Sequence, residues 1–120
     1  MTVEPTPLRL AFFADDFTGS TDALESLTRV DMRTALFLRP PTRAQLAALS
    51  ERLDAVGVAG LTRALSSDEL AQVLRPALEA LRELGPQHIH YKVCSTFDSS
   101  PQTGSIGRAI EVGRDLFRQR

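Results

Sequence analysis

The sequence predicts an α/β fold, namely a three-layer α/β/α sandwich with a mainly parallel sheet. Short apolar runs that suit buried strands alternate along the chain with amphipathic stretches of about 10 residues or more, long enough for crossover helices. Capping boxes, in which Gln45 follows Thr42 and Glu69 follows Ser66 by three positions, mark two of these stretches as helices. Right-handed βαβ units of this kind build a doubly wound sheet.

Three strands are expected in the first half of the chain. Residues 8–14 form an almost uninterrupted apolar run, which suits a strand covered on both faces. Residues 33–38 and 54–60 are the second and third runs, and Pro40 with Pro41 ends the second. A helix is expected after each of the first two strands, with the apolar stripes Ala23, Leu24, Leu27, Val30 and Leu46, Leu49, Leu53.

The second half adds a long helix, a strand and a last helix. The long helix starts after Ser66 and ends at Gly85 and Pro86. Pro76 inside it costs about 3 kcal/mol in a straight helix, so a kink or a break is expected just before this residue. Residues 88–93 form the fourth strand. The last helix carries Ile106, Ala109, Ile110, Gly113 and Phe117 at helical spacing and reaches the final residues without a stop signal, so we expect an incomplete domain at the front of a longer protein.

Composition narrows the class of protein. The 120 residues, of which 42% are hydrophobic and 24% charged, suit one globular domain. A net charge of -1 with scattered Lys and Arg predicts no nucleic-acid partner, and the polar start predicts neither a signal peptide nor a membrane span, so the cytoplasm is the expected compartment. The single cysteine, Cys94, excludes an internal disulfide. His88 and His90 share one strand face without acidic or cysteine neighbours, so no metal site is predicted.

Two adjacent carboxylates lie where the first strand is expected to end and the next helix to begin. Asp15 and Asp16 directly follow the apolar run, and ligands bind at the carboxyl ends of strands in open α/β sheets. We expect one acid to accept hydrogen bonds from substrate hydroxyls and the other to take the proton of a reacting hydroxyl, and we favour Asp16 for the proton. The assignment depends on how the backbone rotates after the strand, which the sequence does not show. A solvated, capped turn is the alternative. Thr18, Ser20 and Thr21 can each cap the start of the next helix. Gly19 allows the backbone to approach a ligand closely, and the charge of Asp22 favours the positive start of the helix.

More polar residues are expected at the same edge of the sheet, because the strands are parallel. Lys92 lies near the end of the fourth strand, Ser95 and Thr96 follow that strand, Gly104 precedes the last helix, and Arg63 follows the third strand. A point charge, hydroxyl donors and a glycine-flanked helix start suit an anionic ligand. The simpler alternatives are a lysine that extends from a strand end to water, an arginine in a surface ion pair and hydroxyls that bond their own loop.

Three stretches of the sequence resemble the N-terminal domain of the four-carbon acid sugar kinase family. They are Ala14-Asp15-Asp16-Phe17-Thr18-Gly19 with Thr21-Asp22, then Thr62-Arg63, then Tyr91-Lys92-x-x-Ser95-Thr96 before Gly104-x-Ile106-Gly107. The resemblance spans essentially the whole chain. It implies an ATP-dependent kinase that phosphorylates threonate, erythronate, 3-oxo-tetronates or related sugar acids, with this part binding the sugar acid. It also implies that ATP and Mg²⁺ are bound mainly by a C-terminal domain absent from these residues.

The resemblance breaks at one place beside the expected substrate. The family usually has an aspartate before the Ser-Thr pair and a Leu-Arg-Gly-Asn run after it, whereas here Cys94 precedes the pair and Phe97-Asp98-Ser99-Ser100-Pro101 follows it. The loss of the arginine and the gain of Asp98 make the site more negative, so these residues do not determine which sugar acid binds. A branched or oxidised acid such as 3-oxo-isoapionate is one candidate. An exposed sheet edge can pair with the edge of a second copy, so a homo-oligomer is a further alternative.

Other classes of protein fit these residues in different degrees. A receiver domain needs an aspartate at the end of its third strand, where this chain has Val58-Ala59-Gly60. A haloacid-dehalogenase-type phosphatase needs two carboxylates one residue apart, whereas Asp15 and Asp16 are adjacent. A non-catalytic module that binds a sugar acid, or an inactive fragment, is the more serious alternative, because the sequence has no glycine-rich phosphate loop to hold ATP.

Overall fold

The computed structural model of the protein describes residues 8–49, 52–94 and 99–118. Its centre is a four-stranded sheet of β1 (Leu10–Ala14), β2 (Thr34–Phe37), β3 (Ala55–Ala59) and β4 (His88–Lys92), in the order β2-β3-β1-β4. All three neighbouring pairs of strands are parallel. The predicted parallel α/β sheet is therefore confirmed, with strands slightly shorter than the apolar runs of the sequence.

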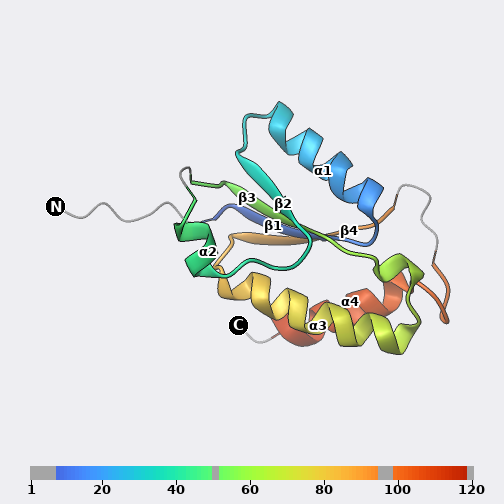
Figure 1. The fold of residues 1–120 in the computed structure, drawn as a ribbon. Helices are drawn as coiled ribbons and strands as arrows, with labels where there is room; N and C mark the ends of the chain where they lie inside the picture. The colour runs from blue at the N-terminus through green and yellow to red at the C-terminus, as the bar shows by residue number, and fades with distance from the viewer. Residues whose placement is uncertain (1–7, 50–51, 95–98, 119–120) are drawn as a thin grey trace.

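Helices cover both faces of this sheet (Figure 1). α1 (Phe17–Arg29) lies on one face, whereas α3 (Ser67–Glu83) and α4 (Ile106–Phe117) pack against each other on the opposite face. The short α2 (Arg43–Ala47) lies beside the end of α3, where the Arg43 guanidinium donates to the carbonyl oxygen of Glu83 at 2.7 Å. The three-layer α/β/α arrangement is confirmed.

The main core lies between the sheet and the layer of α3 and α4. Fully burying one large apolar side chain stabilises a fold by about 1.5–3 kcal/mol, so this layer fixes the strands that carry the site. The buried core cluster consists of Leu8, Ala11, Phe13, Val56, Val58, Leu70, Leu74, Ala77, Leu78, Leu81, Ala109 and Val112.

Within the described residues, no helix is both long and apolar enough to cross a bilayer.

Pro76 does not break α3, which is one continuous helix from Ser67 to Glu83. Buried side chains on both sides of the proline, including Leu74 and Leu78, hold the helix against the sheet. Pro76 itself and Gln72, whose carbonyl loses its helical partner, are exposed, so water can satisfy that carbonyl. Packing therefore outweighs the local cost, so that, of the expected kink or break, the break does not occur.

α2 is shorter than the apolar stripe predicted. It ends at Ala47, so that Leu49 and Leu53 lie beyond it, and Leu49 is 44% exposed. No residue of α2 is buried. Helices gain most of their stability from packing an apolar face against the rest of the protein. A helix without buried residues lacks that stabilisation, so it ends early. The capping box at Thr42 that starts α2, and the one at Ser66 that starts α3, are both present as predicted.

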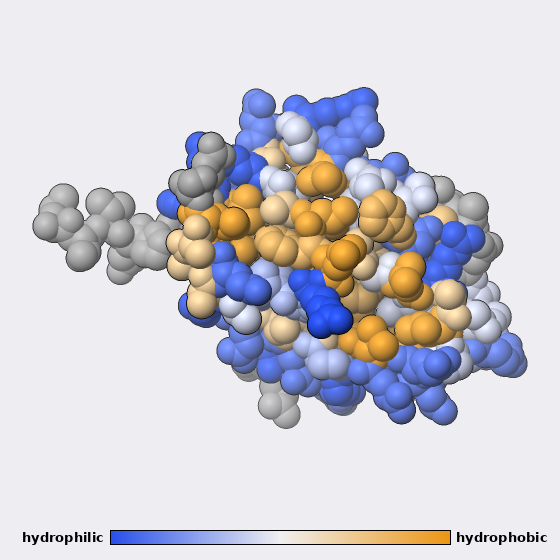
Figure 2. All heavy atoms as spheres, in the orientation of Figure 1, coloured by the Kyte–Doolittle hydropathy of each residue, from blue (hydrophilic) through white to orange (hydrophobic). Residues whose placement is uncertain are grey.

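The sheet has two edge strands in the described part of the chain, β2 and β4. Figure 2 shows apolar residues gathered across the middle of the visible face, between hydrophilic outer surfaces of the helical layers. Leu38, directly after β2, is 77% exposed. On β4, Asp15 N–H donates to the Lys92 carbonyl at 3.0 Å and His88 N–H donates to the Arg9 carbonyl at 3.2 Å, so the peptide groups of the alternate residues Ile89 and Tyr91 face away from β1.

Candidate functional site

The carboxyl ends of β1, β3 and β4 meet at one edge of the sheet. The register pairs Ala14 with both Ala59 and Lys92. Beyond it, Asp15 N–H donates to the Lys92 carbonyl at 3.0 Å, and Arg63 N–H donates to the Asp15 carbonyl at 3.0 Å. Arg63 lies in the short helix η1 (Thr62–Ala64) that follows β3. Asp15, Arg63 and Lys92 therefore lie together, as the parallel sheet predicted.

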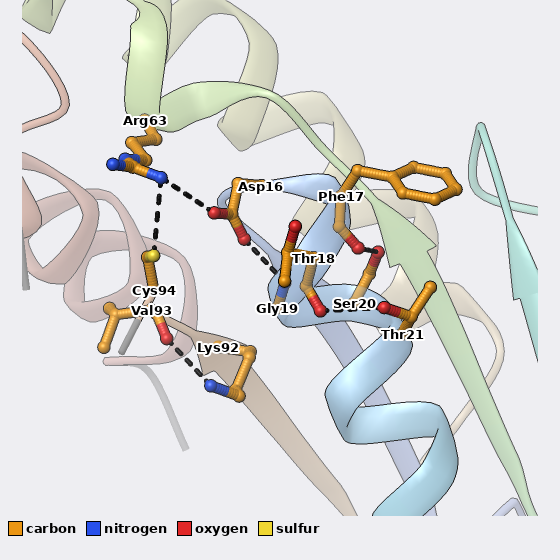
Figure 3. A network of polar contacts seen from close by, with 10 residues as sticks. All are labelled: Asp16, Phe17, Thr18, Gly19, Ser20, Thr21, Arg63, Lys92, Val93 and Cys94. Carbon is orange, nitrogen blue, oxygen red and sulfur yellow. Dashed lines mark hydrogen bonds and ion pairs between the residues drawn. The ribbon is translucent and has the colours of Figure 1, made fainter. Parts of the chain in front are cut away.

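Asp16 is the N-cap residue of α1 and the centre of a polar network (Figure 3). Its Oδ1 accepts the Gly19 N–H at 2.7 Å, and its Oδ2 accepts Arg63 Nη1 at 3.0 Å. Burial alone would raise the pKa of Asp16, but hydrogen bonds from Gly19, the Cys94 thiol and Arg63, together with the arginine charge, hold that pKa below its ordinary value. Asp16 is thus an oriented carboxylate, with 15% of its side chain exposed.

The cap of α1 differs from the prediction that Thr18, Ser20 or Thr21 would supply it. The helix begins at Phe17, directly after β1, so only Asp16 occupies the capping position. The hydroxyls of Ser20 and Thr21 instead donate back to carbonyl oxygens of the first turn. Asp22 lies beyond that first turn, which contains no acidic residue, so its predicted contribution to the helix start is wrong.

Asp15 has a different environment from its neighbour. It is 2% exposed, and its Oδ1 has no hydrogen-bond partner within the part of the chain that the structure describes. Burial raises the pKa of Asp15, and the charge of Asp16 raises it further, against the opposing effects of the Cys94 backbone N–H, Arg63 and Lys92. The two adjacent acids are therefore shifted in opposite directions.

Cys94 belongs to the same network. Its Sγ lies 3.4 Å from Arg63 Nη1, and its thiol contributes to the lowered pKa of Asp16. The residue is 8% exposed. The sequence marks Cys94 as the residue that excludes a disulfide and that stands where the family usually has an aspartate, but it predicts no contact in the site for Cys94. Its place two residues after Lys92, at the carboxyl end of β4, was the signal that could have placed it in the site.

Lys92 extends along the start of α1. Its Nζ donates to the Val93 carbonyl at 2.9 Å, and its Cγ lies 3.8 Å from the position that a Cβ on Gly19 would occupy. Figure 3 shows the Arg63 side chain pointing toward Asp16, whereas the Lys92 side chain turns toward the Val93 carbonyl. The edge thus carries two cationic side chains beside two acids.

Behind the acids lies a buried pair of hydroxyls. Thr62 Oγ1 and the Tyr91 hydroxyl are 2.6 Å apart, and Thr62 is fully buried. Burial raises the pKa of Tyr91 to about 12, and the nearby charge of Asp15 raises it as well, whereas the hydrogen bond with Thr62 opposes this shift. Tyr91 also stacks on Phe13, with ring centroids 6.0 Å apart, which joins the site to the core.

Gly104 supports the segment that carries Arg63. Its φ is +59°, and a Cβ at this position would lie 2.3 Å from the Arg63 carbonyl oxygen. Its N–H donates to the Leu65 carbonyl at 2.7 Å. The close backbone approach is thus to η1. Thr18 is exposed on the first turn of α1, and the predicted ligands Ser95 and Thr96 lie outside the described residues.

Metal-binding side chains do not gather in the described residues, where no group of three or more His, Cys, Asp or Glu side chains could hold a metal ion. The cations of this edge are Arg63 and Lys92. The arrangement can bind an anion, accept hydrogen bonds from hydroxyls and hold an ionised carboxylate beside them.

Comparison with known proteins identifies the family. The model of the sugar-binding N-terminal domain family matches residues 10–120. The chain belongs to this family. A 3-oxo-isoapionate kinase from Paraburkholderia graminis is 48% identical over 112 residues, and a 3-oxo-tetronate kinase from Pseudomonas fluorescens is 40% identical over 113 residues. These matches cover 93% of this chain but only 24% and 25% of the two kinases, so the chain spans about a quarter of their length. The resemblance to the N-terminal domain of four-carbon acid sugar kinases is confirmed.

Solved structures of the family share this fold. A crystal structure from Salmonella typhimurium LT2 superposes with a TM-score of 0.79 at 32% identity, covering 92% of this chain and 25% of that one. A domain of unknown function from Bordetella bronchiseptica, crystallised with bound citrate as a domain-swapped dimer, gives a TM-score of 0.74 at 28% identity, covering 91% of this chain and 26% of that one. The fold therefore belongs to the N-terminal region of longer family members.

Proposed function

We propose that these residues are the sugar-acid-binding part of an ATP-dependent kinase. The observation that carries the proposal is the edge of the sheet, where Asp15, Asp16, Arg63 and Lys92 combine carboxylates that can hold hydroxyls with cations that can hold a carboxylate. The curated relatives are kinases, and the family model is one of sugar binding. Because the chain spans about a quarter of those relatives, the kinase activity belongs to a longer protein.

Asp16 is the proposed proton acceptor for the hydroxyl that attacks the γ-phosphate. Its lowered pKa keeps it ionised at neutral pH, and the bonds from Gly19 and Arg63 fix its orientation. Phosphoryl transfer passes through a loose transition state in which alignment of the acceptor matters more than strong basicity. Two neighbouring acids whose pKa values are driven apart are a common basis for assigning acid and base roles.

The other predicted residues surround the sugar acid in this proposal. Arg63 and Lys92 bind its carboxylate, and Asp15 and Thr18 contact its polar groups, as do Ser95 and Thr96 in the segment outside the described residues. Gly104 acts through the backbone of Arg63. ATP and Mg²⁺ are bound by residues beyond this chain, because this sequence contains no phosphate-binding glycine loop. The reaction is expected in the cytoplasm.

The substrate class that the relatives favour is a 3-oxo sugar acid. Relatives at 48% and 40% identity are named for 3-oxo-isoapionate and 3-oxo-tetronate, respectively.

The test is a thermal-shift and turnover screen of the full-length protein against four- and five-carbon sugar acids, with and without ATP and Mg²⁺. We expect a 3-oxo acid to raise the melting temperature, because a ligand that binds only the folded state stabilises it, and to be phosphorylated. Asp16→Asn should bind the acid but lose most of the turnover, and Asp68→Asn, which changes an exposed acid on α3, serves as its matched control. Absence of stabilisation and turnover with every acid would refute the proposal.

A non-catalytic sugar-acid-binding module is the second candidate. The Bordetella bronchiseptica relative was crystallised with bound citrate, which is a carboxylate ligand. Stabilisation of the full-length protein by sugar acids without any ATP turnover would favour this module over the kinase.

A further inference from the structure

Asp15 is the most unusual ionisable group among the described residues. It is 2% exposed, and its Oδ1 has no hydrogen-bond partner in the described structure. A buried carboxylate oxygen without a donor is costly, and more so when the group is charged. Such an oxygen is expected to acquire either a donor or a proton when the site is filled.

Charged and titratable groups face Asp15 from every side that the structure describes. Asp16 follows it at the start of α1, Arg63 comes from η1, Lys92 and Tyr91 come from β4, and the backbone N–H of Cys94 comes from the segment after β4. The Tyr91 hydroxyl is engaged with Thr62 at 2.6 Å. With both acids ionised, two negative charges are balanced by the two cations Arg63 and Lys92.

A bound sugar acid disturbs this balance. Its carboxylate adds one negative charge and occupies the two cations, so the stabilisation that Arg63 and Lys92 give to ionised Asp15 is reduced. Asp16 is protected from protonation by donors at both of its oxygens. Asp15 has no donor at Oδ1 and lies deeper, so neutralising it restores the balance at the lowest cost.

We propose that Asp15 takes up one proton from solvent when the sugar acid binds, because the substrate carboxylate then occupies the two cations that balance the charge of Asp15. This inference rests on the proposed function, which supplies the carboxylate. No other bond forms or breaks: the proton comes from the buffer, the substrate carboxylate stays ionised, and Asp15 becomes neutral. Asp15 is then a specificity residue, because only an acid, and not a neutral sugar, drives the uptake.

The test is calorimetric titration of the full-length protein with the sugar acid identified by turnover. Titrations at pH 7.5 in phosphate and in Tris, which differ in ionisation enthalpy, give the number of protons exchanged. We expect uptake of about one proton per substrate. Affinity in the parent should also fall about tenfold per pH unit in the range where free Asp15 is ionised, a measurement that needs no variant.

Two variants locate the proton. In Asp15→Asn the amide resembles the protonated acid, so the sugar acid should bind without proton uptake and with an affinity that no longer depends on pH. Asp68→Asn, an exposed acid on α3, should leave the uptake as in the parent.

The outcomes separate this inference from the proposed function. Binding without proton uptake in the parent, or uptake that persists in Asp15→Asn, overturns the inference while the kinase proposal stands. Loss of binding in Asp15→Asn together with no uptake in the parent shows an ionised Asp15 that accepts a substrate hydroxyl, which also overturns it. A full-length protein that binds no sugar acid overturns the proposed function and the inference with it.

Discussion

A single methyl group at Gly104 should disturb both the fold and the site. Gly104 has a φ of +59°, which a residue with a Cβ rarely adopts. A Cβ there would lie 2.3 Å from the carbonyl oxygen of Arg63, 3.1 Å from its carbonyl carbon and 3.2 Å from its Cα. The blocking atoms are backbone, so they cannot move aside as a flexible side chain would.

The expected magnitude follows from two costs. The left-handed conformation costs about 1–2 kcal/mol in a residue with a side chain. Relief of an overlap with fixed neighbours costs about 1–3 kcal/mol. Gly104→Ala should therefore lower the free energy of unfolding by about 2–5 kcal/mol. Because the relief displaces η1, it should also shift Arg63 away from Asp16, to which it is joined at 3.0 Å, and weaken substrate binding.

The assay compares Gly104→Ala with Gly113→Ala in the full-length protein. Gly113 lies inside α4, where a Cβ would meet nothing within 4 Å, so alanine should stabilise that helix by up to about 1 kcal/mol. We expect calorimetry to show a lower Tm for Gly104→Ala alone, with a raised KM for the sugar acid. A Gly104→Ala protein with the Tm and KM of the parent would show that Gly104 does not hold η1 in place.

Three further predictions concern the charged residues and the isolated chain. Asp16→Asn should lower kcat far more than it raises KM, because a lost proton acceptor is felt mainly in the transition state; steady-state kinetics equal to those of the parent would remove Asp16 from the chemistry. Lys92→Met should mainly raise KM for the sugar acid, and an unchanged KM would count against a carboxylate contact. Residues 1–120 alone should show no sugar-acid phosphorylation and should self-associate through the open edges at β2 and β4, whereas an active monomer by light scattering would contradict both expectations.

The fold could be predicted because several independent signals agree. Strand runs, capping boxes and crossover lengths all indicate the same parallel sheet, and local agreement of this kind is what makes a sequence specify one fold. The failures lie where tertiary packing decides. Pro76 remains inside a continuous α3 because buried leucines hold the helix, and α2 stops early because it buries nothing.

The site could be predicted in position but not in detail. Parallel topology was sufficient to bring Asp15, Arg63 and Lys92 to one edge. The contact of Cys94 with Arg63 was not foreseeable, because it depends on the side-chain rotation of a residue at a strand end. The capping role of Asp16 depends on the residue at which α1 begins, and helix boundaries are uncertain from sequence by more than one residue.

The pKa values of Asp15 and Asp16 shift in opposite directions because the two residues lie where β1 ends and α1 begins. Side chains alternate along β1, so Asp15 lies on the same side as Phe13, which packs in the core next to Tyr91. Asp16 is the next residue, still extended at φ -146° and ψ 168°, so it takes the opposite side and meets the free N–H groups of α1. One acid is thereby buried without a donor at Oδ1, and the other is bound by a helix start and an arginine. Adjacency in sequence is thus the feature that makes their ionisation differ, because a single-residue step changes which layer of the sandwich each carboxylate faces.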